Sequence, residues 1–154
     1  MGGLAAATMG GLALSACSAS ASELVGPGRF CGYSPIIDLV AGERVVTVSG
    51  GIHSGSFRWE GGFGALDVNG VGWASPPPGR RADRPTGKGH VRFEQHRSDG
   101  AYRVAIWNGR HGAAYFDSPR PLTPKQLAAI DRVDLFEEGE EPRGCRLRTT
   151  VSWE

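Results

Sequence analysis

Glycine and proline interrupt this chain so often that it has little room for long helices. Its 154 residues include 24 Gly and 10 Pro, roughly 22% of the chain, where a combined share of about 12% is usual. Glycine weakens a helix and proline breaks one, so helix bundles and coiled coils are excluded. Hydrophobic residues make up 40% of the chain, which is enough for a folded core and excludes a fully disordered chain. The length is typical of a single domain.

Between these interruptions, apolar and polar residues alternate with the period of two that is typical of half-buried β-strands. Phe57 and Trp59 oppose the polar residues on either side of them, and Cys145 and Leu147 oppose arginines. The pattern predicts a mainly β domain, an antiparallel sandwich or small barrel of about seven or eight short strands. The alternating segments are residues 43–48, 56–60, 66–69, 90–96, 102–107, 114–116 and 145–153.

The C-terminal half of the chain contains the signals of one short helix. Thr123 is a suitable N-cap, Pro124 suits the first helical position, and Gln126 completes a capping box with Thr123. Leu122 and Leu127 are spaced to form a hydrophobic staple at the same end. Because a helix of around ten residues is unstable alone in water, we expect it to pack on the sheet.

The first residues of the chain are uncharged. Residues 1–16 contain no charged side chain, and residues 4–16 are all apolar or small. A helix over residues 4–16 reaches about 20 Å, well short of the ~30 Å hydrocarbon core of a membrane. The segment therefore predicts the apolar region of a signal peptide rather than a membrane-spanning helix.

The sequence Leu14-Ser15-Ala16-Cys17 resembles a bacterial lipobox, the signal at which a lipid is placed on the cysteine and the peptide is cut before it. The resemblance implies that residues 1–16 are a signal peptide and that Cys17 becomes the lipidated first residue of an envelope lipoprotein. Ser18 stands where an aspartate typically retains lipoproteins in the inner membrane, so the outer membrane is the implied destination in a host that has one. The alternative is an ordinary secretory signal, in which Cys17 plays no part.

Three regions follow from these patterns. Residues 1–16 form the signal peptide, residues 17–28 are small and polar and form a flexible tether, and residues 29–154 form a single β-rich domain. The formal net charge of +1 removes the argument for a general nucleic-acid binder. The expected partners are the membrane, through the lipid anchor, and an envelope protein or glycan, and no cofactor is predicted.

The cysteines point to an oxidising compartment. If Cys17 carries lipid, Cys31 and Cys145 remain as a pair in an exported protein, and thiols there are normally paired. A bridge between them would close a loop of more than 100 residues. The alternative is two buried free thiols. No Cys-x-x-Cys motif occurs, so thioredoxin-like redox chemistry and zinc-ribbon sites have no support.

The glycine-rich run at residues 49–56 is the segment whose residue types are best suited to binding or catalysis. His53, Ser54 and neighbouring glycine amides there are suited to bind an anion or an oxyanion. The run lacks the Gly-x-Ser-x-Gly spacing of a nucleophile elbow and the ending of a phosphate loop. The alternative interpretation is a glycine-rich hairpin turn. No metal site is predicted, because His90 and His96 would lie about 20 Å apart on one strand.

The tryptophans have two interpretations, as large core residues or as an aromatic platform for sugars. Trp107 is the candidate for an exposed ligand-binding residue, because its strand parity opposes the apolar Val104 and Ile106. We expect a functional site, if there is one, to lie near His53, Ser54 and Trp107. The four tryptophans are Trp59, Trp73, Trp107 and Trp153.

Charge is concentrated in two segments of the chain. Residues 75–89 contain four prolines and a local charge of +3, and residues 137–141 carry a local charge of −4. Charge runs of this kind are usually solvated surface. The leading hypothesis is a non-enzymatic lipid-anchored envelope protein whose β domain binds or supports another envelope component. The alternatives are a small hydrolase-like enzyme that uses His53, and an enzyme inhibitor that presents the loop at residues 75–89.

Overall fold

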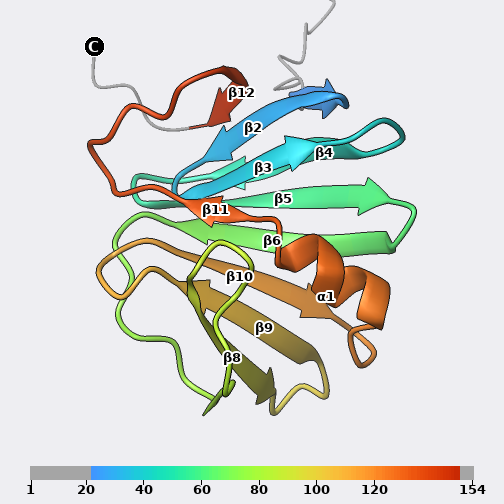
Figure 1. Ribbon diagram of the computed structural model, residues 1–154, viewed down its shortest axis with the longest axis vertical. Helices are drawn as coiled ribbons and strands as arrows, with labels where there is room; N and C mark the ends of the chain where they lie inside the picture. The colour runs from blue at the N-terminus through green and yellow to red at the C-terminus, as the bar shows by residue number, and fades with distance from the viewer. Residues whose placement is uncertain (1–21, 150–154) are drawn as a thin grey trace, which may run out of the picture.

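Two β-sheets face each other in the computed structural model, which describes residues 22–149 (Figure 1). The larger sheet has eight strands and the smaller has four, and one short helix lies beside the smaller sheet. This architecture confirms the mainly β class and selects the sandwich from the two predicted forms. The lipidation candidate Cys17, and Val151 and Trp153 near the C-terminus, lie outside the described residues.

The larger sheet is antiparallel throughout and is built mostly from hairpins between neighbours in sequence. Its strand order is β1-β4-β5-β6-β10-β9-β8-β7. The strands are β1 (Glu23–Val25), β4 (Arg44–Gly50), β5 (Ser54–Gly61), β6 (Gly64–Val71), β7 (Arg80–Arg81), β8 (Val91–His96), β9 (Tyr102–Trp107) and β10 (Ala113–Ser118).

The smaller sheet brings both ends of the domain together. Its order is β11-β3-β2-β12, with strands β2 (Gly28–Gly32), β3 (Pro35–Leu39), β11 (Asp134–Leu135) and β12 (Cys145–Thr149). Strand β12 runs parallel to β2, while the other pairs are antiparallel. A disulfide joins Cys31 to Cys145 across this parallel pair, with the two Cα atoms 5.8 Å apart. The predicted bridge is therefore present.

The number of strands exceeds the prediction of seven or eight. Residues 22–149 contain twelve, because short strands with little alternation also pair. Strand β1 is the clearest difference, since it lies within the segment expected to be a flexible tether. It pairs with β4, and the Ser22 amide donates to Thr47 Oγ1 at 3.0 Å. Leu24 packs against the core, so ordered structure begins before the predicted boundary at residue 29.

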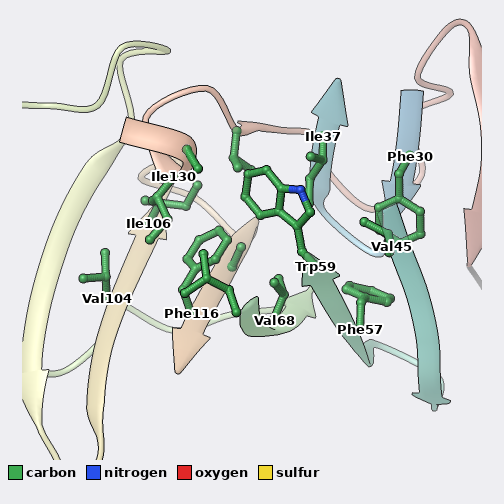
Figure 2. Packing of buried hydrophobic residues seen from close by; sticks show 14 of the residues in the cluster. Phe30, Ile37, Val45, Phe57, Trp59, Val68, Val104, Ile106, Phe116 and Ile130 are labelled. Carbon is green, nitrogen blue, oxygen red and sulfur yellow. The ribbon is translucent and has the colours of Figure 1, made fainter. Parts of the chain in front are cut away.

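The core between the layers is aromatic at its centre (Figure 2). Phe57 and Trp59 point inward from β5 and are almost fully buried, as their alternation predicts. Phe57 meets Phe30 of the smaller sheet edge to face, with ring centroids 4.8 Å apart. Ile106 and Phe116 extend the same core beneath the helix, where Ile130 is fully buried.

The helix α1 (Pro124–Ile130) begins with the predicted capping box. Thr123 Oγ1 accepts a hydrogen bond from the Gln126 amide at 3.2 Å, and Gln126 Oε1 accepts one from the Thr123 amide at 2.9 Å. Leu122 and Leu127 both pack against the core. Gln126 Nε2 also donates to the Ala65 carbonyl at 3.3 Å, which attaches the helix to β6.

A charged pair fixes the other end of the helix over the core. Arg132 Nη2 lies 2.5 Å from Glu43 Oε1, and the Glu43 side chain is only 7% exposed. The Arg132 guanidinium also lies over the Trp59 ring, 5.6 Å from its centroid. The pair thus connects the β3–β4 turn to the chain that follows α1, and it covers the largest core side chain.

The disulfide gives the first testable prediction. We expect the double variant Cys31→Ser and Cys145→Ser to unfold at lower urea concentration than the parent protein. The loop-entropy model gives a loss of about 4 to 5 kcal/mol for a closure of this length, and 114 residues separate the two cysteines. Equilibrium unfolding followed by tryptophan fluorescence measures it. Cys17→Ser is the control and should not shift the midpoint, and equal midpoints for all three proteins would contradict the prediction.

Candidate functional site

The glycine-rich run at residues 49–56 forms a tighter hairpin than its composition suggests. Strands β4 and β5 extend into it and leave a turn of residues 51–53. A side chain at Gly55 would collide with the Tyr33 ring, and one at Gly50 would lie 2.7 Å from the Tyr33 hydroxyl oxygen. The Tyr33 hydroxyl donates to the Gly51 carbonyl at 2.7 Å. These glycines therefore make room for an aromatic ring.

His53 projects from this turn and pairs with an acidic residue. Its Nδ1 lies 2.8 and 3.0 Å from the two carboxylate oxygens of Glu138. The side chain of His53 is 56% exposed and that of Glu138 39% exposed. The partner comes from the acidic run at residues 137–141.

Ser54 does not join His53 in a nucleophilic pair. Within residues 22–149, no hydrogen bond links the Ser54 hydroxyl to His53, although a Ser–His nucleophile needs that contact. Ser54 begins β5 and lies on the outer face of the larger sheet. It shares a cross-strand row with Val71, Ala113 and Trp107. The geometry that a hydrolase would require of His53 and Ser54 is therefore not assembled.

Trp107 occupies the face that its parity predicts but is not close to His53. Strands β6 and β10 separate β5 from β9, so Trp107 lies about 14 Å from Ser54 along the row. Its indole Nε1 donates to the Arg110 carbonyl at 3.0 Å, and the side chain is half-buried. The expectation that Trp107 is the exposed tryptophan beside the glycine-rich run is thus wrong.

Among the three tryptophans within residues 22–149, Trp73 is the exposed one instead, and it follows Gly72, which bonds to His53. It is 64% exposed and stacks on the imidazole of His111, with ring centroids 4.2 Å apart and an interplanar angle of 3°. The preceding Gly72 donates its amide to the His53 carbonyl at 2.8 Å, and the Ala74 amide donates to the His111 carbonyl at 2.7 Å.

These contacts define one surface at this end of the sandwich. We call it the Trp73 surface, and it comprises Ile52, His53, Trp73, His111 and Glu138. Ile52 is 55% exposed beside His53.

The sequence does contain a signal that could have indicated Trp73. The residue follows the end of a strand and precedes three consecutive prolines, so it lies outside the sheet and has no core position to fill.

The carboxylate of Glu137 supports this surface from behind. Its side chain is 16% exposed, and its Oε1 accepts hydrogen bonds from Asn108 Nδ2 at 2.8 Å and from the His111 amide at 3.4 Å. Ser34 holds the same segment in place, because it accepts the Phe136 amide at 2.9 Å and donates its hydroxyl to the Phe136 carbonyl at 2.9 Å. The turn that carries His111 is thereby fixed relative to Trp73.

The basic loop at residues 75–89 packs along the surface of the domain. Arg80 and Arg81 form β7 and pair with the edge of β8. Thr86 is buried, and Gly87 packs against the backbone of Asp131. An inhibitor loop would be expected to project into a partner's cleft, and this loop is instead fastened to the fold at these points.

Comparison with known proteins adds no relative. No protein-family model, no curated protein and no solved structure matches this chain. Among residues 22–149, no group of three or more His, Cys, Asp or Glu side chains is arranged to hold a metal ion.

Glu137 and Glu138 provide a matched pair of substitutions. We expect Glu137→Ala to lower the free energy of unfolding by about 1 to 3 kcal/mol, because it removes the largely buried, charged acceptor of the Asn108 side chain and the His111 amide. Glu138→Ala removes an exposed pair and should cost less than about 1 kcal/mol. Urea unfolding of both variants tests the difference, and equal losses would contradict the supporting role of Glu137.

Proposed function

We propose that this protein is a lipid-anchored envelope protein whose β domain binds a glycan through the Trp73 surface. One observation carries the proposal. Trp73 is 64% exposed although one of its faces is stacked flat on His111. Most of a large apolar side chain is thus held in a fixed orientation toward solvent.

The chemistry of the surface suits a sugar ring. The face of an indole carries partial negative charge and attracts the weakly positive C–H groups on the flat side of a pyranose. Sugar hydroxyls at the ring edge need hydrogen-bonding partners, and His53 and Glu138 can supply them. Both lie next to Gly72, the residue before Trp73: the Gly72 amide donates to the His53 carbonyl, and the Glu138 carboxylate lies close to the Gly72 Cα. Because His111 already orders the indole, binding costs little side-chain entropy.

The location of the protein rests on other observations. The resemblance of residues 14–17 to a lipobox supports lipid attachment at Cys17. The disulfide between Cys31 and Cys145 fits an oxidising compartment outside the cytoplasm. Export to the envelope, with the outer membrane as destination where the host has one, would place the Trp73 surface among envelope glycans.

No helix within residues 22–149 has both the length and the apolar character to cross a membrane.

Glycan binding is tested with insoluble cell-wall glycan as the probe. We expect the detergent-purified protein to co-sediment with it and Trp73→Ala to weaken binding about tenfold or more, as for a central aromatic contact. Val40→Ala is the control, since Val40 is 50% exposed in the turn at the opposite end of β4. Failure of the parent protein to co-sediment, or equal binding by Trp73→Ala, would remove the proposal. Soluble glycan fragments should compete for binding. If the protein co-sediments only with glycan that still carries wall-associated protein, the surface would be assigned to a protein partner.

Lipid attachment gives a separate prediction. The parent protein should partition into the detergent phase and the membrane fraction, whereas Cys17→Ala should remain in the aqueous phase because it cannot carry the lipid. Phase separation followed by blotting measures this. Cys31→Ala is a control for the loss of a cysteine as such and should still partition into detergent. Equal partitioning of the parent and Cys17→Ala would contradict the lipoprotein assignment.

A further inference from the structure

Strand β8 turns its polar face toward the inner side of the larger sheet. Its register places Arg92 opposite Ile106 and Glu94 opposite Val104, and both partners on β9 are buried core residues. Val91 and Phe93 consequently lie on the outer face. The chain around α1 faces this part of the sheet, since Leu122 and Leu127 line a cavity together with Glu94 and Val104.

Arg92 is held in this space without an adequate partner. Its side chain is 23% exposed, and its nearest carboxylate oxygens are Glu94 Oε1 at 3.6 Å and Asp131 Oδ1 at 3.9 Å. Within the described part of the chain its guanidinium donates no hydrogen bond, and its Nε is buried and unpaired. A guanidinium has five N–H donors, and burying them without acceptors is costly.

Two cavities adjoin at this end of the larger sheet, and Arg92 lines the smaller of them. A cavity of about 240 Å³ is lined by Arg80, Arg84 and Arg92 together with Asp83 and Glu94. Its three guanidinium groups outnumber its two carboxylates. Glu94 is already paired with Arg80 at 2.5 Å, and Arg84 makes no ion pair within residues 22–149. Asp131 faces Arg92 from the end of α1 but is too distant for a hydrogen bond.

The second cavity has about 370 Å³ and shares Arg80 and Glu94 with the first. Val104, Leu122 and Leu127 form its apolar wall. The opposite wall is the stacked pair of His96 and Tyr102, with ring centroids 4.5 Å apart. This volume lies at the small end of the range for ligand sites, which suits a short chain or one ring rather than a full-length lipid tail.

We propose that the two cavities together bind a small amphipathic acid, a short apolar chain or ring that ends in a carboxylate or phosphate. The acidic group lies on Arg92 and Arg84 and supplies the acceptors that the Arg92 guanidinium lacks. The apolar body lies against Leu122 and Leu127. The site is separate from the Trp73 surface and does not depend on the glycan proposal.

The proposal is tested by calorimetric titration of the full chain carrying Cys17→Ala, which avoids detergent. The probes are octyl phosphate, octanoate and, as an uncharged control, octanol. We expect both acids to bind at least tenfold more tightly than octanol. Arg92→Gln should weaken the acids about tenfold or more and leave octanol unchanged, whereas Leu127→Ala should weaken all three. Arg120→Gln, an exposed arginine outside both cavities, is the matched control and should bind like the parent.

Several outcomes would overturn the site. These are no binding of either acid, equal binding of octanol and octanoate, or unchanged affinity in Arg92→Gln. If Arg92→Gln does not fold, Arg84→Gln takes its place, because Arg84 is exposed and makes no ion pair within residues 22–149. Vesicles with anionic phospholipids form the last arm. The parent protein could sediment with these vesicles, lose that binding in Arg84→Gln or Arg92→Gln, and fail to bind octanoate. That result would assign the arginines to lipid headgroups and overturn the small-acid ligand.

Discussion

A sheet of eight strands cannot be buried by a sheet of four, and this mismatch organises the rest of the molecule. The smaller sheet covers the half around β4, β5 and β6, where Phe30 packs on Phe57. The inner face beyond it needs another cover, and α1 supplies it over Ile106 and Phe116. Helix α1 has only seven residues, so its capping box, its bond to β6 and the Glu43–Arg132 pair together hold it in place. Strand β8 lies past this cover and keeps its polar inner face.

How much the sequence predicts depends on whether the responsible contacts are local. The capping box of α1 spans four adjacent residues, so it is visible without a structure. The disulfide follows from pairing the cysteines of an exported chain. The exposure of Trp73 and the poor pairing of Arg92 depend on the order of the strands and on which face of each strand is covered. Residues far away in the sequence determine both. The glycine-rich run at residues 49–56 misleads for the same reason, because the ring that needs its space belongs to Tyr33.

The segment Asp134–Glu138 links the fold to the candidate surface. Three connections each present one histidine to it, since His90 contacts Asp134 at 2.7 Å, His111 approaches Glu137 at 3.8 Å and His53 contacts Glu138 at 2.8 Å. The chain then continues to β12, where the disulfide fastens it to β2. The acidic run is therefore only partly a solvated surface. Its first residues hold together the turns that orient Trp73 and His53.

The two proposed sites rest on opposite kinds of imbalance. At the Trp73 surface an apolar ring is left in water, and the free energy recoverable on binding comes from covering it. At the cavities beside β8 the Arg92 guanidinium has carboxylates at 3.6 and 3.9 Å but donates no hydrogen bond within residues 22–149, and binding of an acid there would supply hydrogen bonds that folding does not. Each imbalance costs stability, and the fold has the means to avoid it, because an apolar residue in place of Arg92 would face the buried Ile106. The proposed acid would give the guanidinium at that position the hydrogen-bond acceptors that its neighbours Glu94 and Asp131 lie too far away to supply.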